Sequence, residues 1–181
     1  MEWMRACKQL WQNAGAGGRF LIRLGLFLLI WELIYRLLVV PYTGVDQFFI
    51  EREVQHAGWL LEKLGFPVDL SSATPGIIDR IYIIDGYGSV VVKRNCNALE
   101  LMAIIPLLMW AYPASRRHRS WMVAGMLIVF LLNMVRIAAL AWLQAYHPQW
   151  LDFNHTYTFN VLVAVLIMLG WLWWIKKVDA A

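Results

Sequence analysis

Four long apolar segments constrain the fold of this chain more than any other feature. The first reads FLIRLGLFLLIWELIYRLLVV over residues 20–40, and about 20 such residues are enough to cross ~30 Å of hydrocarbon as a helix. Further apolar segments follow at 97–113, 121–146 and 156–176. Only 15% of the 181 residues are charged, against about 25% in soluble domains. The sequence therefore predicts an integral membrane protein.

A short amphipathic segment precedes the first apolar run. Residues 2–12 (EWMRACKQLWQ) bring apolar side chains to one face of a helix and basic ones to another, which is typical of a helix on a membrane surface. Residues 13–18 (NAGAGG) indicate a flexible break. The run after them is longer than the roughly 7–15 apolar residues of a signal-peptide core, so we expect a membrane helix that is retained.

The segment 42–95 differs in kind from the apolar runs around it. Its first part, VDQFFIEREVQHAGWLLEKLG, mixes apolar and charged residues as a surface helix does and ends at Gly65. Two β-rich stretches, IIDRIYII and SVVVK, then flank an Asp-Gly sequence at 85–86, which favours a β-hairpin. We expect a small folded α+β cap, a helix plus a β-hairpin, that rests on the membrane helices.

Basic residues at the ends of the apolar runs predict the orientation of the chain. They occur near the N-terminus, between the second and third segments and after the fourth, namely Arg5, Lys8, Arg19, Arg23, Arg116, Arg117, Arg119, Lys176 and Lys177. The positive-inside rule assigns all three groups to the cytoplasm, and four spans satisfy this assignment. The prediction is one all-α membrane domain, 1–181, divided into a cytoplasmic interfacial helical segment (1–19), a first span (20–41), an extracytoplasmic cap (42–95), a second span (96–113), a cytoplasmic loop (114–120), a third span (121–146), an extracytoplasmic loop (147–154) and a fourth span (155–175).

Three polar residues on different spans are expected at one level of the membrane. Cys96 begins the second span at its outer end, and His155 opens the fourth span at the same end. Arg136 precedes Tyr146, the end of the third span, by ten residues, or about 15 Å at 1.5 Å per residue. We therefore expect all three in the outer half of the bilayer.

Each of the three also has a simpler explanation. A lone cysteine in an apolar protein is most often inert packing, and a histidine at a helix start is more often an interfacial cap than a catalyst. Arg136 fits such an explanation least, because an arginine within a span costs at least about 2.5 kcal/mol and no acidic residue shares its segment. Asn133, one turn earlier, is placed to orient it.

Thiol acyl transfer is a chemistry that uses all three residues. A helix N-terminus stabilises the thiolate of Cys96 through its dipole and backbone N–H groups. Arg136 would stabilise that thiolate or the oxyanion of a tetrahedral intermediate. His155 would accept the thiol proton and return one to the leaving amine. The spacing alone leaves this chemistry open, because it does not establish that the spans bring the groups together.

Cys96 at a helix start, then Asn133-Met134-Val135-Arg136-Ile137, then His155 at the start of the last span resemble, in that order, the exosortase/archaeosortase family. The resemblance covers roughly residues 93–160. It implies a polytopic membrane cysteine protease or transpeptidase with Cys96 as the nucleophile, Arg136 as the essential arginine and His155 as the third catalytic position. Many members have more spans, so this chain resembles a compact branch.

The resemblance also implies clients and a location. The clients would end in a short motif, a transmembrane helix and a basic tail, and would be cleaved through a thioester and passed to a surface anchor or to water. The enzyme would be a multi-pass protein of a prokaryotic cytoplasmic (inner) membrane, in contact with membrane lipids, with its active site on the extracytoplasmic side.

Three asparagines are candidate supporting residues, Asn133, Asn154 and Asn97. The last belongs to Cys96-Asn97-Ala98, where the family usually has Cys-Ser-Gly or Cys-Ala-Gly, so the backbone beside the thiol is expected to differ. Glu100, one turn after Cys96, would oppose thiolate formation unless it is paired with Arg136 or Arg94.

Two other classes of function are weighed against this one. A non-enzymatic membrane scaffold or accessory subunit would use Arg136 only to bond helices together. A quinone-linked thiol oxidoreductase would need cysteine pairs, but the two cysteines lie far apart, at positions 7 and 96. We expect no metal and no cofactor, because no Cys or His spacing indicates one. We also expect no nucleic-acid partner, because the basic residues follow the ends of the spans.

Overall fold

The computed structural model describes residues 15–96, 98–112 and 119–179. Its helical segments are α2 (Ala16–Ile34), the π-helical turn η1 (Tyr35–Val39), α3 (Val40–Tyr42), α4 (Val45–Lys63), the 3₁₀ turn η2 (Arg94–Cys96), α5 (Leu99–Ala111), α6 (Arg119–Tyr146), the 3₁₀ turn η3 (Pro148–Trp150), α7 (Leu151–Phe153), the π-helical turn η4 (Asn154–Thr158) and α8 (Phe159–Asp179). Its strands are β1 (Val68–Ser71), β2 (Arg80–Ile83) and β3 (Ser89–Val91). The expected interfacial helix at 2–12 lies outside the described residues.

Three helical stretches in the described part of the chain are long and apolar enough to cross a membrane. They run over Ala16–Tyr42, Ser120–Tyr146 and Pro148–Asp179. The helix expected as a further span, α5, has 13 residues, or about 20 Å of helix. It is apolar along its length and contains Pro106, which removes one backbone hydrogen bond.

The first long helix begins earlier than the sequence pattern predicts. Helix α2 begins at Ala16, so the second half of the expected break at 13–18 is helical. Glycine costs about 1 kcal/mol relative to alanine within a helix. Two glycines at one end therefore do not stop a helix that the following apolar residues continue.

The last helical stretch also differs from the prediction of a loop at 147–154 followed by a span at 155–175. The chain is already helical from Pro148 onward through η3, α7 and η4 before α8 begins. Proline is favoured at the first position of a helix because it has no N–H to satisfy there. His155 consequently lies inside a helical stretch and does not open it.

The polar segment between α3 and α5 contains the helix and hairpin that its pattern indicates. Helix α4 ends at Lys63, and β2 pairs antiparallel with β3 with Ile81 opposite Val90. The structure adds a strand that the sequence analysis missed, β1, which pairs antiparallel with β2 with Leu70 opposite Ile81. The result is a three-stranded sheet in the order β1-β2-β3.

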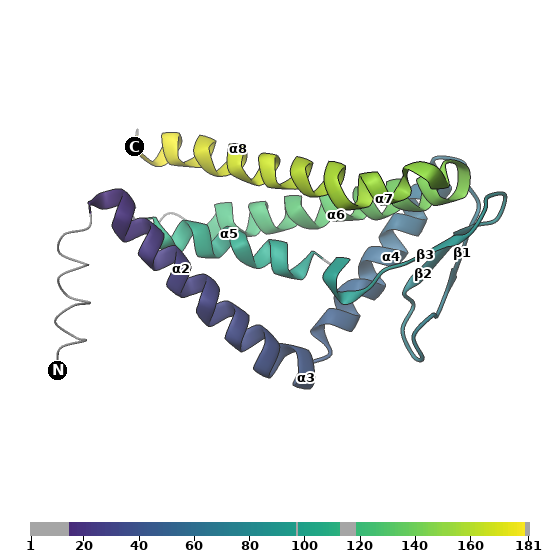
Figure 1. Cartoon of the computed structure of the whole chain (residues 1–181), viewed down its shortest axis with the longest axis horizontal. Coiled ribbons are helices and arrows are strands. Elements are labelled where there is room, and N and C mark those ends of the chain that lie inside the picture. The colour runs from purple at the N-terminus through teal and green to yellow at the C-terminus, as the bar shows by residue number, and fades with distance from the viewer. Residues whose placement is uncertain (1–14, 97, 113–118, 180–181) are drawn as a thin grey trace.

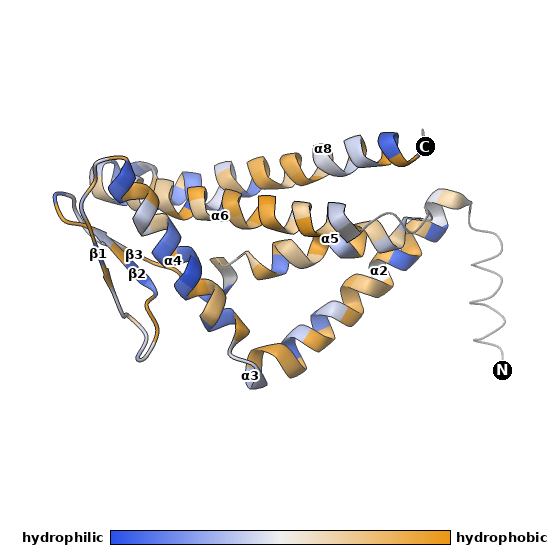
Figure 2. Ribbon diagram, turned by 180° about the vertical axis from the view of Figure 1, so that it is seen from behind, coloured by the Kyte–Doolittle hydropathy of each residue, from blue (hydrophilic) through white to orange (hydrophobic). Residues whose placement is uncertain are grey.

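Figure 1 shows how these parts are arranged: α2 and α4 form a V whose apex is α3, and α5 runs between α2 and α6. The sheet and α4 lie at one end of the molecule, and the start of α2 and the end of α8 lie at the other. Figure 2 shows that α2, α5, α6 and α8 are largely apolar, whereas α4 carries many polar residues.

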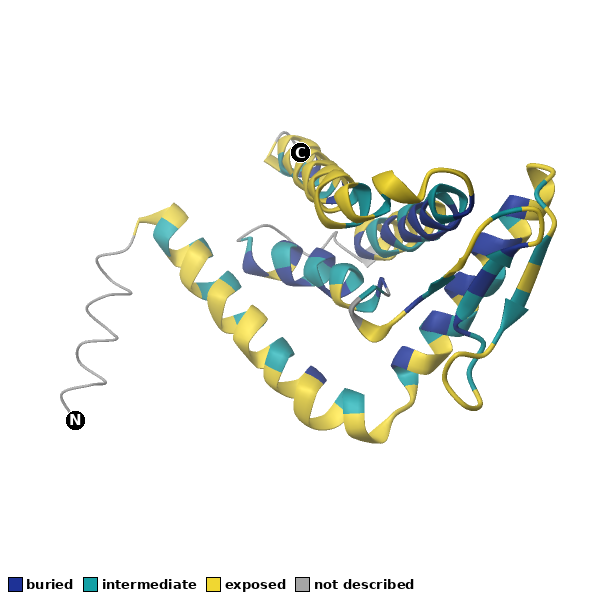
Figure 3. Ribbon diagram, turned by 45° about the vertical axis from the view of Figure 1, so that its right-hand side comes forward, coloured by how far each residue is buried: buried dark blue, intermediate teal, exposed yellow. Residues whose placement is uncertain are grey.

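Two groups of buried side chains hold these layers together. One joins α4, the sheet and the C-terminal half of α6, and Cys96 packs against it. The other joins α5, α6 and α8 around Trp174. Figure 3 shows the consequence, because buried residues line α4, α5 and α6 whereas most of α2 is exposed. Helix α6 therefore connects the apolar bundle to the polar end of the molecule.

Candidate active site

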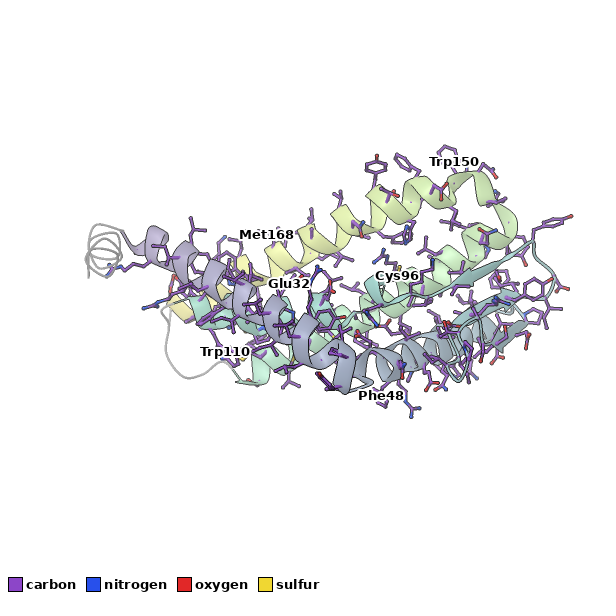
Figure 4. The ribbon with its side chains drawn as sticks, turned by 60° about the horizontal axis from the view of Figure 1, so that its bottom comes forward. Glu32, Phe48, Cys96, Trp110, Trp150 and Met168 are labelled. Carbon is purple, nitrogen blue, oxygen red and sulfur yellow. The ribbon has the colours of Figure 1, made fainter. Side chains whose placement is uncertain are left out.

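Cys96 lies in a short turn that leads from the sheet into α5. The turn is the 3₁₀ segment η2, and the Cys96 N–H donates to the carbonyl of Lys93 at 2.8 Å. Helix α5 begins only at Leu99, so Cys96 precedes the helix by three residues and is not its first residue. Figure 4 shows Cys96 in the middle of the molecule, whereas Trp150 and Phe48 lie at its periphery.

The imidazole of His155 contacts this thiol. The Cys96 Sγ and the His155 Nε2 are 3.5 Å apart, although 59 positions separate the two residues in the sequence. His155 belongs to η4, a π-helical turn between α7 and α8. Such turns insert one extra residue per turn and are frequent at functional sites. The arrangement is that of a thiol beside a base that can take its proton.

A carboxylate that the sequence analysis did not single out holds the turn. Glu53 on α4 is fully buried, and its Oε1 accepts a hydrogen bond of 2.7 Å from the backbone N–H of Ala98. Ala98 is the N-cap of α5, and its methyl side chain cannot form the hydrogen bond of a helix cap. A carboxylate from another helix thus satisfies one of the N–H groups that every helix start leaves open.

Asn133 on α6 connects this carboxylate to the cysteine. Its Nδ2 donates to Glu53 Oε2 at 3.0 Å and to the backbone carbonyl of Cys96 at 3.0 Å. Both partners are acceptors, so only one orientation of the amide satisfies them. Asn133 is 1% exposed, and in such a site these hydrogen bonds are strong because water does not compete for them.

Arg136 lies one turn further along α6 and is 7% exposed. Residues three apart share a helix face, so its guanidinium is on the side of Asn133. Its Nε has no hydrogen-bond partner among the described residues. Burial raises the pKa of Glu53 from 4.5 to about 7, while hydrogen bonds from Ala98 and Asn133 and the charge of Arg136 act to lower it. Arg136 and Glu53 therefore attract each other.

A second acidic residue of α4 holds the other end of the turn. The Asp46 Oδ2 lies 3.5 Å from the Nε of Arg94 in an ion pair, and its Oδ1 accepts a hydrogen bond of 2.6 Å from the hydroxyl of Tyr35. Arg94 precedes Cys96 by two residues, and Tyr35 belongs to the first long helix. The chain on both sides of the cysteine is therefore tied to α4.

A comparison with protein families bears on this geometry. The family model for the transmembrane exosortase (Exosortase_EpsH) matches residues 14–173, which include Cys96, His155 and the residues of the site around them. The chain belongs to the transmembrane exosortase family. Exosortases are generally cysteine-type transpeptidases, so membership indicates a multi-pass membrane protein with a transpeptidase role in protein sorting. The resemblance seen in the sequence is thereby confirmed. No curated protein sequence matches this chain, and no solved structure does.

The remaining predicted residues of this exosortase lie as follows. The Asn154 side chain donates to the carbonyl of Trp150 in its own helix at 2.8 Å, so it stabilises the turn before His155. Asn97 lies outside the described residues. Glu100 is exposed and interacts electrostatically with Glu32, Asp46 and Arg36. Among the described residues Glu100 forms no ion pair with Arg136 or Arg94, and Arg94 pairs with Asp46 instead.

The exosortase sequence does contain a signal for Glu53, on the helix that supplies it. Residues 50, 54, 57 and 61 form the apolar face of α4, and position 53 falls on that face. An acidic residue on an apolar face is rarely buried without a partner. The pattern of α4 also fits a surface helix, in which Glu53 is one of several charged residues.

The apolar bundle of this exosortase contains a cavity, and the described residues contain no cluster suited to a metal ion. No group of three His, Cys, Asp or Glu side chains in that part of the chain could hold a metal ion. A cavity of about 220 Å³ lies between α5, α6 and α8, lined by apolar side chains such as Ile105, Val129 and Trp171. It contains no group that could attack a peptide bond.

Proposed function

We propose that this exosortase cleaves the C-terminal sorting signal of membrane-tethered client proteins through a thioester on Cys96. The observation that carries the proposal is the 3.5 Å contact between Cys96 Sγ and His155 Nε2 in a chain of the transpeptidase family. A thiol and an imidazole from distant parts of the sequence meet here, which is the arrangement that nucleophilic catalysis requires.

The proposed reaction has two transfers. The Cys96 sulfur attacks the scissile carbonyl carbon, and the thiol proton passes to His155 Nε2. The peptide C–N bond then breaks, the proton moves from His155 to the leaving amine, and a thioester remains. An acceptor amine, or water, attacks the thioester carbon and releases the thiol of Cys96. An amine acceptor gives a client attached to a surface anchor, and water gives a cleaved client.

Arg136 and Asn133 have separate roles in this proposal. The guanidinium of Arg136 stabilises the thiolate or the oxyanion of the tetrahedral intermediate, which is most effective in a buried site. Asn133 fixes the carbonyl of Cys96 and so orients the nucleophile. Asn97 and Asn154 are assigned supporting roles, Asn154 through the turn that carries His155.

We propose that the site faces the extracytoplasmic side of a prokaryotic inner membrane. In support, the basic residues Arg19 and Arg23 lie at the start of α2, and Lys176 and Lys177 lie at the end of α8. These ends meet, since the rings of Phe20 and Trp171 stack with centroids 5.3 Å apart. Positive residues mark the cytoplasmic side. The site lies away from these ends, because Cys96 precedes the start of α5, whereas the other end of α5 contacts the end of α8.

In this orientation we propose that α5 is a short fourth span and that 42–95 forms the extracytoplasmic cap. Helix α5 packs between α2 and α6 and ends near the cytoplasmic end of α8, where the Tyr112 hydroxyl donates to Asp179 at 2.7 Å. A client held by its own transmembrane helix presents the adjoining segment at the level of Cys96. Tethering of this kind raises the local concentration without tight binding.

The test is a trapped thioester. A client ending in an apolar helix and a basic tail is co-expressed with the exosortase, and Cys96 is examined by mass spectrometry for a hydroxylamine-sensitive adduct. We expect the adduct in the wild type and in Cys7→Ser, the matched control, and no adduct in Cys96→Ser. Normal client processing by Cys96→Ala would contradict the proposal and favour a scaffold role.

A further inference from the structure

Glu53 is the most deeply buried charged group beside the candidate site, and it takes no direct part in the reaction proposed above. It is 0% exposed, and it lies on α4, outside the long apolar helices. A buried carboxylate is costly unless hydrogen bonds and an opposite charge compensate it. Glu53 has both kinds of compensation, and each connects it to the machinery around Cys96.

The first connection is mechanical. One carboxylate oxygen accepts from the N–H of Ala98, and the other accepts from Asn133, whose amide also holds the carbonyl of Cys96. The turn that carries the thiol is therefore fastened to α4 and α6 on either side of residue 97. A nucleophile misplaced by about 1 Å can lose on the order of 10²-fold in rate, so this fastening affects the reaction.

The second connection is electrostatic. The groups that titrate or carry charge in this cluster are Glu53 on α4, Arg136 on α6, Cys96 in η2 and His155 in η4. Arg136 attracts Glu53, so part of the field of the guanidinium falls on that carboxylate. An ionised Glu53 therefore limits how strongly Arg136 favours the thiolate.

We propose that Glu53 is a positioning residue for Cys96: its carboxylate fixes the cysteine turn and balances the charge of Arg136. This inference rests on the proposed function, because it concerns the same thiol. It assigns to α4 a part in the chemistry that goes beyond covering the membrane helices.

The test measures the thiol directly and needs no client. Full-length protein in membranes is treated with iodoacetamide from pH 5 to 10, and alkylation of Cys96 is followed by peptide mass spectrometry, which separates it from Cys7. In Glu53→Gln the charge that opposes Arg136 is gone, so the pH of half-maximal alkylation falls by about one unit. Glu53→Asp keeps the negative charge, so the pH of half-maximal alkylation of Cys96 changes less.

Two further variants make the result specific. Asp79→Asn is the matched control, because Asp79 is also buried and bonds backbone N–H groups, but those belong to the 73–74 loop. It leaves the alkylation profile unchanged. In an Arg136→Gln background, Glu53→Gln causes a much smaller shift, because no guanidinium remains for Glu53 to balance. The double variant also removes both buried charges together, which destabilises a fold less than leaving one of them uncompensated.

The outcomes separate the two proposals. An unchanged profile in Glu53→Gln, an equal shift in Asp79→Asn, or a full shift without Arg136 would each overturn the role of Glu53. The proposed function fails on a different result, which is client processing by Cys96→Ala. If Glu53→Gln shifts the alkylation profile but Cys96→Ala still processes clients, the role of Glu53 beside the thiol stands. Only the proposed peptidase reaction would then be rejected.

Discussion

Two buried carboxylates of the polar end, Glu53 and Asp79, are held in opposite ways. Burial raises the pKa of Glu53 to about 7. Burial acts in the same direction on Asp79, but hydrogen bonds from the Thr74 hydroxyl and from the N–H groups of Ala73 and Thr74 outweigh it, so the pKa of Asp79 lies below its usual value. Protonation of Glu53 therefore stabilises the folded state, whereas protonation of Asp79 destabilises it.

The raised pKa of Glu53 predicts a pH-dependent stability. The folded protein binds this proton more tightly than the unfolded chain, so the contribution is full below pH 4.5 and is lost as the pH rises through about 7. The loss amounts to about 3 kcal/mol at 1.36 kcal/mol per pKa unit. Chemical unfolding in detergent should show the wild type losing that much between these pH values relative to Glu53→Gln.

Asp79→Asn is the control for this measurement. A lowered pKa gives stability that is present above the ordinary value of 3.8 and is lost only as the pH falls below it. The slope between pH 4.5 and 7 should therefore stay that of the wild type. A wild-type slope in Glu53→Gln would mean that another group binds the proton.

At the scale of single residues, the sequence made some site residues visible and hid others. Arg136 and Asn133 were conspicuous because polar side chains are rare within an apolar run. Cys96 and His155 were expected where polar and apolar segments meet, and their contact at 3.5 Å depends on a long-range arrangement that spacing does not contain. Glu53 stands among many charged neighbours, so only its place on the apolar face of α4 distinguishes it.

At the scale of elements, apolar length and alternation predicted the long helices, α4 and the β2-β3 hairpin. The ends of the helices were less predictable. A glycine lowers the stability of a helix by only about 1 kcal/mol, and a proline is compatible with the first position of a helix. Strand β1 has four residues, and two of them are polar. Its pairing with β2 comes from the tertiary fold and leaves little trace in the local pattern.

The hairpin is attached to α6 at a close contact that requires a glycine. A Cβ at Gly86 would lie 2.3 Å from the Cβ of Ala145, and the next N–H, of Tyr87, donates to the Ala145 carbonyl at 3.0 Å. We expect Gly86→Ala to destabilise the protein by about 1–3 kcal/mol, as overpacking does. Thermal unfolding in detergent measures the change.

Gly25→Ala is the matched control for the hairpin contact, because nothing lies within 4 Å of a Cβ at Gly25. It adds a methyl group to α2 and should leave stability equal or raise it by up to about 1 kcal/mol. If Gly86→Ala unfolds at the wild-type temperature, the hairpin does not depend on this contact with α6.

At the scale of the whole molecule, the basic ends of α2 and α8 and the candidate site lie apart. The start of α2 and the end of α8, with their basic residues, meet at one end, whereas α4 and the sheet lie at the other (Figure 1). The cysteine turn leads from the sheet into α5. Cys96 can reach a client outside the cytoplasm only if the end with α4 and the sheet faces away from the cytoplasm. The orientation of the chain is therefore a condition of the proposed function.

Labelling from outside the cell tests that orientation. In a background of Cys7→Ser and Cys96→Ala, single cysteines are introduced by Ser72→Cys, in the exposed loop after β1, and by Lys176→Cys, at the exposed end of α8. A membrane-impermeant maleimide should label the first in intact cells and the second only after the membrane is opened. The opposite result, with Lys176→Cys labelled in intact cells and Ser72→Cys not labelled, would mean that Cys96 and His155 face the cytoplasm. A client translocated across the membrane could not then reach the thiol, and the sorting reaction would have to be abandoned even if the contact between sulfur and imidazole persisted.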